Sequence, residues 1–480
     1  MLSSFLRNAL LVLVLNLGVK GVYLFGIERT VQNRLPEADY GLYFSLLGLG
    51  MVLQVIADCG LQLYNSRTLS GHRYLLAKYF PYFLGLKTVL GALFLAVLLA
   101  VGYGIGYRGS EMGLLLLIGF GQVLNSLVLY LRSGLAGLGR YALDSSFSIL
   151  DKVLMISIVG GVLYWAPERL SIGFFAGAQV WSWALTAGGL ALTLRGRLER
   201  VRPRFDRRKL VMLLRGGAPY AIAILLQAAY TRTDAVMIER LLPDGAAAAG
   251  HYAAGYRLLD AVNTVGWLMA GLLLPMYARL HARREPLGEL LRFSVHTLVG
   301  GALVLSIPVA FYARPIVYLL YDFAEPRTAA ILVFLSLSFV AQCLNYVYGA
   351  LLGATGLIGR MNYVFAAGMV LNVVGNLLVL PRFGAPGAAA VTLATQSFIA
   401  TVQAVLAHRW LGLPAATVDW GHLLMLGGIL PAPVVLVASF LFMPWAWQLL
   451  LLWLLGLALL LVFRLVDVRQ VMKLVREKGG

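Results

Sequence analysis

Long apolar runs, separated by short polar or basic stretches, recur along the whole chain. Two examples are LLLLIGF from Leu114 and LLLLWLLGLALLLVF from Leu449. Strands of a membrane barrel would alternate apolar and polar residues over about ten positions, and these runs do not alternate. A helix that crosses a bilayer needs about 20 mainly apolar residues, with its backbone groups bonded inside the helix. The pattern therefore predicts membrane-spanning helices.

Windows of about 19 residues predict about 14 transmembrane helices, and hence an all-α polytopic membrane protein. The first six are expected at 9–30, 41–64, 82–106, 112–132, 148–166 and 171–194. The others are expected at 212–238, 247–276, 293–313, 329–353, 361–380, 386–408, 422–442 and 445–465.

The composition agrees with a lipid environment. Of the 480 residues, 60% are hydrophobic and 12% are charged, and the mean hydropathy is +0.82. A globular domain is typically about 25% charged, so the composition excludes a water-soluble enzyme. The 52 glycines are suited to close contacts between membrane helices.

The net charge of +18 is spread among short loops rather than gathered in one patch. With the N-terminus in the cytoplasm, most Lys and Arg residues fall at cytoplasmic helix ends, as the positive-inside rule requires. The stretch RGRLERVRPRFDRRK at 195–209 is then a cytoplasmic linker that contacts anionic lipid. We expect both termini in the cytoplasm and no binding of nucleic acid.

Short sequence elements recur after about 210 residues, the period expected of an internal repeat. Ile27-Glu28-Arg29 recurs as Ile238-Glu239-Arg240, and Gly41-Leu42-Tyr43 recurs as Gly250-His251-Tyr252. Later in each copy, Gly139-Arg140 matches Gly359-Arg360. Six spans separate the copies, so both halves have the same orientation in the membrane.

The repeat predicts two six-helix lobes related by a pseudo-twofold axis along the membrane normal, followed by two C-terminal helices. The expected domains are an N-terminal lobe at 1–194, a cytoplasmic basic linker at 195–210, a C-terminal lobe at 211–410, two additional transmembrane helices at 411–466 and a cytoplasmic tail at 467–480.

Seven charged residues lie inside predicted spans, where each costs about 2.5–3.5 kcal/mol at a helix centre. They must therefore be paired, extend to the membrane surface, or face a wet cavity. Arg257 and Asp260 are three residues apart, so we expect them to meet on one helix face. The full set is Lys20, Asp58, Lys87, Arg232, Asp234, Arg257 and Asp260.

Three of these residues have open alternatives. Arg232 and Asp234 are two positions apart and point away from each other, so they need other partners. Asp234 also lies near the outer end of its span, where a charge is ordinary. Lys87 lies near a span end and could extend its ammonium to the surface.

Polar side chains form stripes along several spans. In the second span Gln54, Asp58 and Gln62 follow steps of four, and in the eighth Tyr252 and Tyr256 lead to Asp260. Polar contacts between packed helices would explain a single stripe. Stripes in corresponding helices of both lobes favour a shared hydrophilic cavity. Its other candidate lining residues are Asn16, Tyr23, Gln227, Asn263, Gln342 and Asn345.

Motifs of enzymes are missing from the sequence. It contains no P-loop, no metal-ligand spacing and no long loop that could carry a catalytic motif, which argues against a membrane glycosyltransferase. Cys59 and Cys343 both fall inside spans and are interpreted as small apolar residues. We therefore expect no enzymatic activity, no cofactor and no metal.

The segment ERTVQNRLPEADYGLYFSLLGLGMVLQVIADCGL from Glu28 resembles the opening of polysaccharide-type flippases. These are Wzx-like members of the multidrug/oligosaccharidyl-lipid/polysaccharide (MOP) exporter superfamily. The matching residues are Tyr40-Gly41-Leu42-Tyr43, Asp58 with Gly60-Leu61, and Arg67, and GHYAAGYRLLDAV from Gly250 resembles the equivalent element of the second lobe. The resemblance extends over essentially the whole chain and implies a MATE-like MOP fold.

The resemblance also implies a function. Such flippases move an undecaprenyl-diphosphate-linked oligosaccharide to the outer leaflet of the bacterial inner membrane by alternating access, for cell-surface polysaccharide synthesis. Lys20, Arg232, Arg257 and Lys87 are then expected to contact the diphosphate. Asp58, Asp234 and Asp260 would carry a coupling sodium ion or proton, or hold these cations in place. Membrane lipids, a polysaccharide polymerase and assembly proteins are the other expected partners.

Two relatives within the superfamily remain as alternatives. A lipid II flippase shares the plan of 14 spans and would differ in its lipid substrate. A cation-coupled multidrug exporter usually has 12 spans, and cationic drugs favour an acidic cavity over Lys20, Arg232 and Arg257.

Overall fold

The computed structural model describes residues 18–61, 73–137, 140–195, 206–440, 443–463 and 465. Helices are the regular structure throughout this described part of the chain, and they group by packing into two units. The first unit runs to Arg240 and also includes Asp244–Gly250. The second comprises Leu241–Pro243 and His251 onward. The predicted all-α polytopic fold is confirmed.

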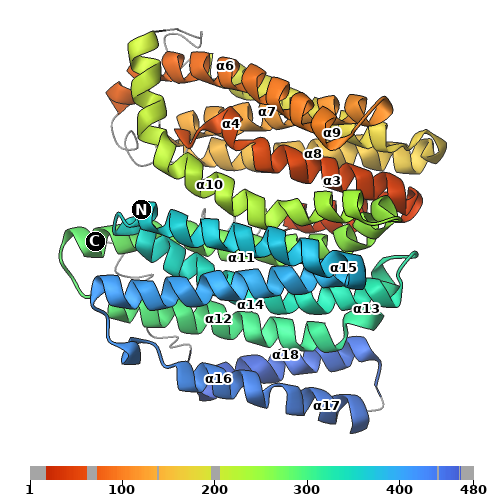
Figure 1. Cartoon of the computed structure of the whole chain (residues 1–480), viewed down its shortest axis with the longest axis vertical. Coiled ribbons are helices and arrows are strands. Elements are labelled where there is room, and N and C mark those ends of the chain that lie inside the picture. The colour runs from red at the N-terminus through yellow and green to blue at the C-terminus, as the bar shows by residue number, and fades with distance from the viewer. Residues whose placement is uncertain are drawn as a thin grey trace. The chain divides into compact units, whose positions relative to one another are not determined.

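The helices of the first unit are labelled in Figure 1. They are η1 (Val22–Glu28), α2 (Arg29–Arg34), α3 (Glu37–Leu53), α4 (Val55–Asp58), α6 (Arg73–Ile105), α7 (Ser110–Gly137), α8 (Tyr141–Trp165), η2 (Pro167–Arg169), α9 (Ile172–Arg195) and α10 (Arg207–Leu241).

The helices of the second unit begin with α11, whose first residues belong to the first unit. They are α11 (Gly245–Ala282), α12 (Gly288–Phe311), α13 (Ala313–Leu320), α14 (Pro326–Ala354), α15 (Ile358–Leu411), η3 (Ala415–Thr417), α16 (Trp420–Ile429), α17 (Pro431–Phe440) and α18 (Trp445–Val462).

Eleven helices of the described residues are long and apolar enough to cross a membrane. Three differences separate this number from the 14 predicted spans. Most of the first predicted span, 9–30, lies outside the described residues. The sixth is present as α9, which is not among the eleven. The spans at 361–380 and 386–408 form α15 together, with non-helical backbone at Gly384 between them.

Small residues let helices of the first unit approach closely. A Cβ atom on Gly41 would lie 1.8 Å from the Ala246 carbonyl oxygen, and one on Gly250 would lie 2.5 Å from the Glu37 carbonyl oxygen. These two glycines are the equivalent residues of the internal repeat, so the repeat itself forms the crossing of α3 with the start of α11. Farther along α3, the Ser45 hydroxyl donates to the Ala235 carbonyl oxygen at 2.9 Å.

Tyrosines that are equivalent in the repeat make corresponding contacts. In the first unit the Tyr43 hydroxyl of α3 donates to Gln179 Oε1 of α9 at 2.9 Å. In the second unit the Tyr252 hydroxyl of α11 lies 3.4 Å from Thr392 Oγ1 of α15. Each bond joins the second helix of a predicted lobe to its sixth, as expected for two copies of one six-helix plan.

The predicted domain boundaries follow the sequence repeat, and they stay a prediction. Helix α10 opens the second copy of the repeat, yet its residues up to Arg240 pack with the first unit. Most of the basic linker at 195–210 and the whole tail at 467–480 lie outside the described residues.

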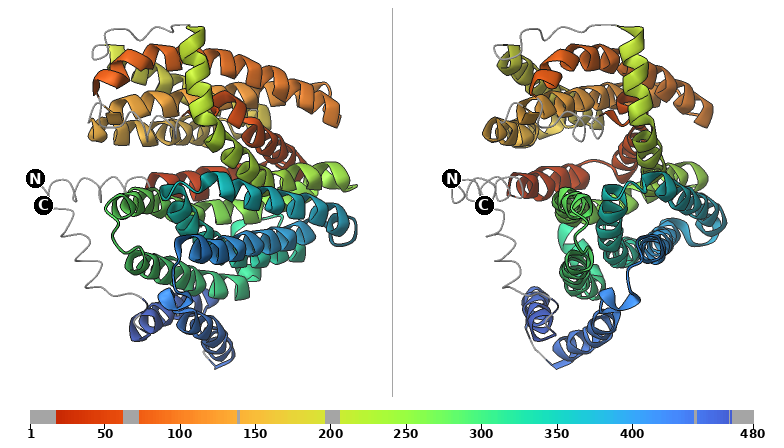
Figure 2. Two further views of the ribbon diagram at one scale, coloured as in Figure 1. Left: turned by 60° about the vertical axis from the view of Figure 1, so that its left-hand side comes forward. Right: turned by 90° about the vertical axis from the view of Figure 1, so that its left-hand side faces the viewer.

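The helices after α15 pack on the side of α12, inside the second unit (Figure 2). Leu460 of α18 fills the space beside Gly300, and Val304 of α12 fits beside Gly456. The Tyr312 hydroxyl donates to Gln448 Oε1 of α18 at 2.6 Å. The thirteenth predicted span, 422–442, is divided into α16 and α17 where Pro431 follows Leu430, because proline cannot donate to a helix interior.

Candidate functional site

A buried ion pair joins two of the predicted charges inside the first unit. Lys87 of α6 bonds through Nζ to Asp58 Oδ1 of α4, and Nζ also donates to Ser126 Oγ of α7 at 2.7 Å. The Lys87 side chain is 5% exposed and that of Asp58 is 17% exposed. Lys87 is therefore paired within the protein rather than extended to a membrane surface, and Asp58 is its counter-ion.

The polar stripe predicted for the second span is interrupted after Asp58. Helix α4 ends there, because Cys59 is left-handed at φ 47° and Gly60 follows at φ 69°. A Cβ atom on Gly60 would lie 2.4 Å from the Gly217 carbonyl oxygen of α10. The helical spacing that relates Gln54 to Asp58 thus stops short of Gln62, which lies outside the described residues, as does Asn16.

A second charged group surrounds Lys20. The charges acting on the Lys20 ammonium include those of Lys152, Asp151 and Arg132. Lys152 of α8 places its ammonium 4.5 Å from the centre of the Tyr23 ring, and α8 packs against η1, which carries Tyr23. The predicted residues Lys20 and Tyr23 therefore lie in one charged and aromatic environment.

The other predicted residues of the first unit lie along α10 and at the end of α3. Asp234 is fully buried, and Arg232 is half-buried with its carbonyl oxygen against Gly48. Gln227 is exposed, and Gln54 is half-buried. Each of them stays a predicted site residue.

In the second unit, Arg257 and Asp260 form the ion pair expected from their spacing on α11. Arg257 Nη1 lies 3.6 Å from Asp260 Oδ2, and both side chains are partly exposed. One turn earlier, the rings of Tyr252 and Tyr256 lie 5.6 Å apart and are buried. Asn263 continues the same helix and is half-buried.

Amides and hydroxyls fill much of the remaining interior of the second unit. Asn345 Nδ2 of α14 donates to Gln396 Oε1 of α15 at 2.8 Å, and Gln342 Nε2 donates to Ser338 Oγ at 3.2 Å. Gln403 is 1% exposed, and neither polar atom of its amide has a partner among the described residues. The other buried polar residues of α15 are Asn372, Asn376, Thr392 and Thr395.

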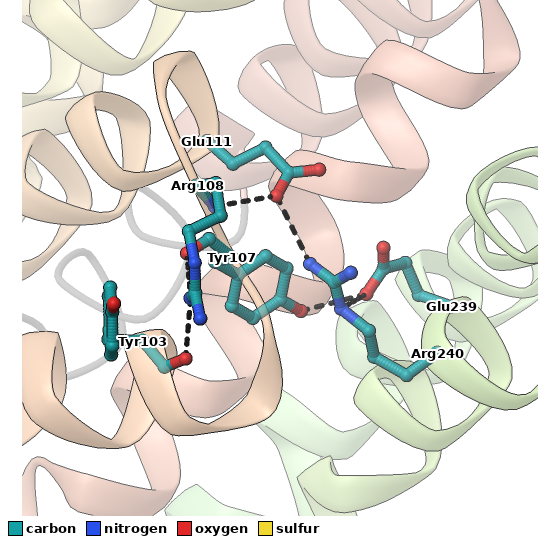
Figure 3. A network of polar contacts seen from close by, with 6 residues as sticks. All are labelled: Tyr103, Tyr107, Arg108, Glu111, Glu239 and Arg240. Carbon is teal, nitrogen blue, oxygen red and sulfur yellow. Dashed lines mark hydrogen bonds and ion pairs between the residues drawn. The ribbon is translucent and has the colours of Figure 1, made fainter.

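A polar network ties the outer end of α10 to the turn between α6 and α7, within the first unit (Figure 3). The Tyr107 hydroxyl donates to Glu239 Oε2 at 2.8 Å, and Arg240 Nε lies 3.0 Å from the same oxygen. The Arg240 guanidinium stacks 3.6 Å from the Tyr107 ring centre and bonds to Glu111 Oε2 at 3.3 Å. Burial and the neighbouring Glu239 carboxylate raise the pKa of Tyr107, so the hydroxyl stays a donor.

The equivalent glutamate of the first repeat has a different tyrosine. Glu28 accepts a bond from the Tyr40 hydroxyl at 2.8 Å, and both side chains are buried. Tyr40 precedes Gly41, so its equivalent before Gly250 is Ala249. Because Ala249 has no hydroxyl, Glu239 is held by Tyr107 of the first repeat instead. Both networks support the helix ends and leave the Lys20 region separate.

Sequence reasoning missed several charged residues near Lys20. Asp151 and Lys152 lie inside the predicted span 148–166, so their charge was itself the signal that could have found them. Arg132 and Asp144 belong to neighbouring helices and gain their meaning only from the fold. The described residues contain no group of three His, Cys, Asp or Glu side chains that could hold a metal ion.

Comparison with known proteins assigns a family. A sequence profile described as polysaccharide biosynthesis protein matches residues 5–281. A search of curated protein sequences finds no match.

Three solved structures share the fold, which is all that identities this low establish. The lipid II flippase MurJ, in an inward closed conformation, has a TM-score of 0.70 at 12% identity, with 96% of this chain and 100% of that chain covered. An inward-facing multidrug resistance transporter of the MATE family has 0.60 at 15%, with 81% and 94% covered. A MOP-superfamily transporter from Pyrococcus furiosus has 0.59 at 16%, with 84% and 93% covered.

Proposed function

The chain belongs to the polysaccharide biosynthesis protein family, and we propose that it flips an undecaprenyl-diphosphate-linked oligosaccharide from the inner to the outer leaflet of a bacterial inner membrane. The family and the MOP fold make the chain a multi-pass membrane transporter. The proposal adds the substrate, the direction and the location, with both termini in the cytoplasm.

The observation that carries the substrate proposal is the charged interior of the first unit. Lys20 and Lys152 are half-buried on spanning helices and act on each other's charge. Charge inside a membrane protein is costly and marks a substrate or ion pathway. A diphosphate supplies the negative charge that such cations lack. A cationic drug would be repelled by them, which favours a glycolipid over the substrates of multidrug exporters.

The second unit offers contacts for the sugar. Tyr252, Tyr256 and the amides of α14 and α15 present neutral donors and acceptors, which suit hydroxyl groups. Arg257 remains a candidate for diphosphate contact, with Asp260 as its counter-ion. Asp58 and Asp234 remain candidates for ion coupling by sodium or a proton. A polysaccharide polymerase and assembly proteins would receive the flipped product.

A lipid II flippase is the second candidate, and one observation favours it. The superposition on MurJ covers 96% of this chain, including the helices after α15, whereas that on the multidrug transporter covers 81%. The two flippase functions need the same diphosphate contact and differ in the attached sugar.

The test is a deletion strain from which polyprenyl-linked lipids are extracted and assigned to a leaflet. We expect one sugar-linked carrier to accumulate on the inner leaflet. The wild-type gene should reverse this accumulation, whereas Lys20→Ala and Arg257→Ala at normal expression should not. Accumulation of lipid II together with lethality would move the assignment to the second candidate. Unchanged carrier lipids with altered sensitivity to cationic drugs would contradict both.

A further inference from the structure

Three cations converge in the first unit on helices that are distant in the sequence. Lys20 lies one turn before Tyr23 of η1, Lys152 lies on α8, and Arg132 lies on α7. Helix α8 packs against both η1 and α7, and the charges of Lys152 and Arg132 both act on Lys20. The fold therefore brings like charges together inside segments that cross the membrane.

The carboxylates of the same region do not balance these cations. Arg132 Nε bonds to Asp144 Oδ1 at 2.8 Å, and Lys152 Nζ lies 3.4 Å from Asp151 Oδ2. Among the described residues, no hydrogen bond or ion pair engages the Lys20 ammonium. Three cations with two carboxylates leave an excess positive charge centred on Lys20.

The α8 surface that carries these groups is open within its own unit. Only 11% of the Leu143–Trp165 window is buried, compared with 67% for Glu37–Asp58. Asp151 and Lys152 are both half-buried. A ligand can thus reach Lys152, whereas Lys87 is enclosed by Asp58 and Ser126. Of the lysines that this unit places in spans, Lys20 and Lys152 are accessible and Lys87 is not.

We propose that Lys20 and Lys152 together bind a phosphate group of the transported lipid, with Arg132 adding long-range attraction; this assignment rests on the function proposed above. Two ammonium groups offer six N–H donors, and charge-assisted bonds to phosphate are short and strong. An anion between them also removes the repulsion of two like charges in a medium of low dielectric constant.

The neighbours of Lys152 have separate roles in this site. The face of the Tyr23 ring attracts the ammonium and positions it without neutralising it. Asp151 competes with the phosphate for the same ammonium, which keeps binding reversible, as transport requires. Removing the Asp151 charge should therefore strengthen phosphate binding, an effect opposite to that of removing Lys152.

The test measures lipid binding by native mass spectrometry on the full-length protein in detergent. The probes are undecaprenyl diphosphate, phosphatidylglycerol and inorganic pyrophosphate. We expect Lys152→Gln and Lys20→Gln each to weaken undecaprenyl diphosphate binding about tenfold, the loss of one charge-assisted bond. Lys152→Arg should keep binding and Asp151→Asn should tighten it several-fold. The control Arg169→Gln, an exposed cation of η2, should bind as the wild type.

The outcomes separate this site from the proposed function. If Lys152→Gln binds undecaprenyl diphosphate as tightly as the wild type, the site is wrong, even where the deletion strain shows a flippase defect. If the variants weaken the three probes as expected but the deletion strain has normal carrier lipids, the site stands and the transport proposal fails. Equal weakening for phosphatidylglycerol alone would assign the site to a structural membrane lipid and overturn a substrate role.

Discussion

The two units differ in how they accommodate polar groups among apolar helices. The first unit uses charge: Lys87 pairs with Asp58, Arg132 with Asp144, and Lys152 lies beside Asp151. The second unit uses mainly neutral groups, such as Asn345 with Gln396. The pair on α11, Arg257 with Asp260, is looser at 3.6 Å and more exposed.

This difference divides the work of binding a glycolipid in the function that we propose. A charged interior favours the diphosphate, and a neutral polar interior favours sugar hydroxyls. The internal repeat supplies both units with one helical plan, as the paired contacts of Tyr43 and Tyr252 illustrate. Divergence of polar residues on that plan then produces the chemistry. The comparison can be tested because it predicts different costs for similar substitutions in the two units.

The largest effect is expected for Lys87→Met. This change leaves the Asp58 carboxylate buried without its counter-ion, which costs about 3–5 kcal/mol in other buried pairs. The same change at Arg257, whose pair with Asp260 is partly exposed, should cost about 1 kcal/mol or less. The measurement is denaturant unfolding of purified protein in mixed micelles.

A double variant serves as the control for this prediction. Replacing both partners, as Lys87→Met with Asp58→Leu, should recover most of the lost stability because no unpaired charge remains. Equal destabilisation by Lys87→Met and Arg257→Met would show that the two units do not differ in this way.

The sequence predicted what depends on local spacing, and Arg257 with Asp260 is the clearest instance. Their separation of three residues places both on one helix face, whatever the tertiary structure is. The apolar runs likewise predicted most spanning helices to within a few residues. The recurrence of Gly41 as Gly250 predicted the repeat, although it did not predict that these glycines contact each other.

The sequence could not predict what depends on packing between distant segments. Asp58 and Lys87 lie 29 residues apart, and no periodicity relates them. The left-handed Cys59 depends on the close approach of Gly60 to Gly217 of α10, so the stripe through Gln54 and Asp58 was extended too far. Candidate site residues were thus identified by type, while their partners required the fold.

The second prediction compares two deletions of a tyrosine hydroxyl. Tyr40→Phe removes a donor from the buried Glu28 carboxylate of the first unit, and bonds to charged groups contribute about 1.5–3 kcal/mol. Tyr252→Phe removes a contact of 3.4 Å to the Thr392 hydroxyl of the second unit, and a neutral bond contributes about 0.5–1.5 kcal/mol. Thermal unfolding in one detergent should rank Tyr40→Phe as clearly less stable. The reverse ranking would contradict the assignment of charge to the first unit.

The third prediction concerns a neutral amide of the second unit. Gln403→Leu replaces two buried polar atoms that have no partner among the described residues, so we expect the protein to become more stable by about 1 kcal/mol. Gln396→Leu is the matched control, because its amide accepts the bond from Asn345, and it should be destabilising. Both are measured by unfolding in mixed micelles. If Gln403→Leu is as destabilising as Gln396→Leu, the Gln403 amide has an interaction partner beyond the described residues.

The smallest effect is expected for Asp419→Asn, which tests a charge of the second unit that lies outside its spans. The Asp419 carboxylate accepts bonds from the side chain and the backbone N–H of His422 at the start of α16, and these bonds lower the pKa of Asp419. A lowered pKa stabilises the fold at pH values above the ordinary value of about 4, and this contribution is lost as the pH falls through the folded-state pKa. The side chain is 48% exposed, so solvent limits the effect to about 0.5 kcal/mol. Unfolding at pH 7 and at pH 3 should separate variant and wild type only at pH 7, because the charge is then present in the wild type alone. A loss of several kcal/mol at pH 7 would place strong ionic stabilisation in the second unit and remove the contrast with the first.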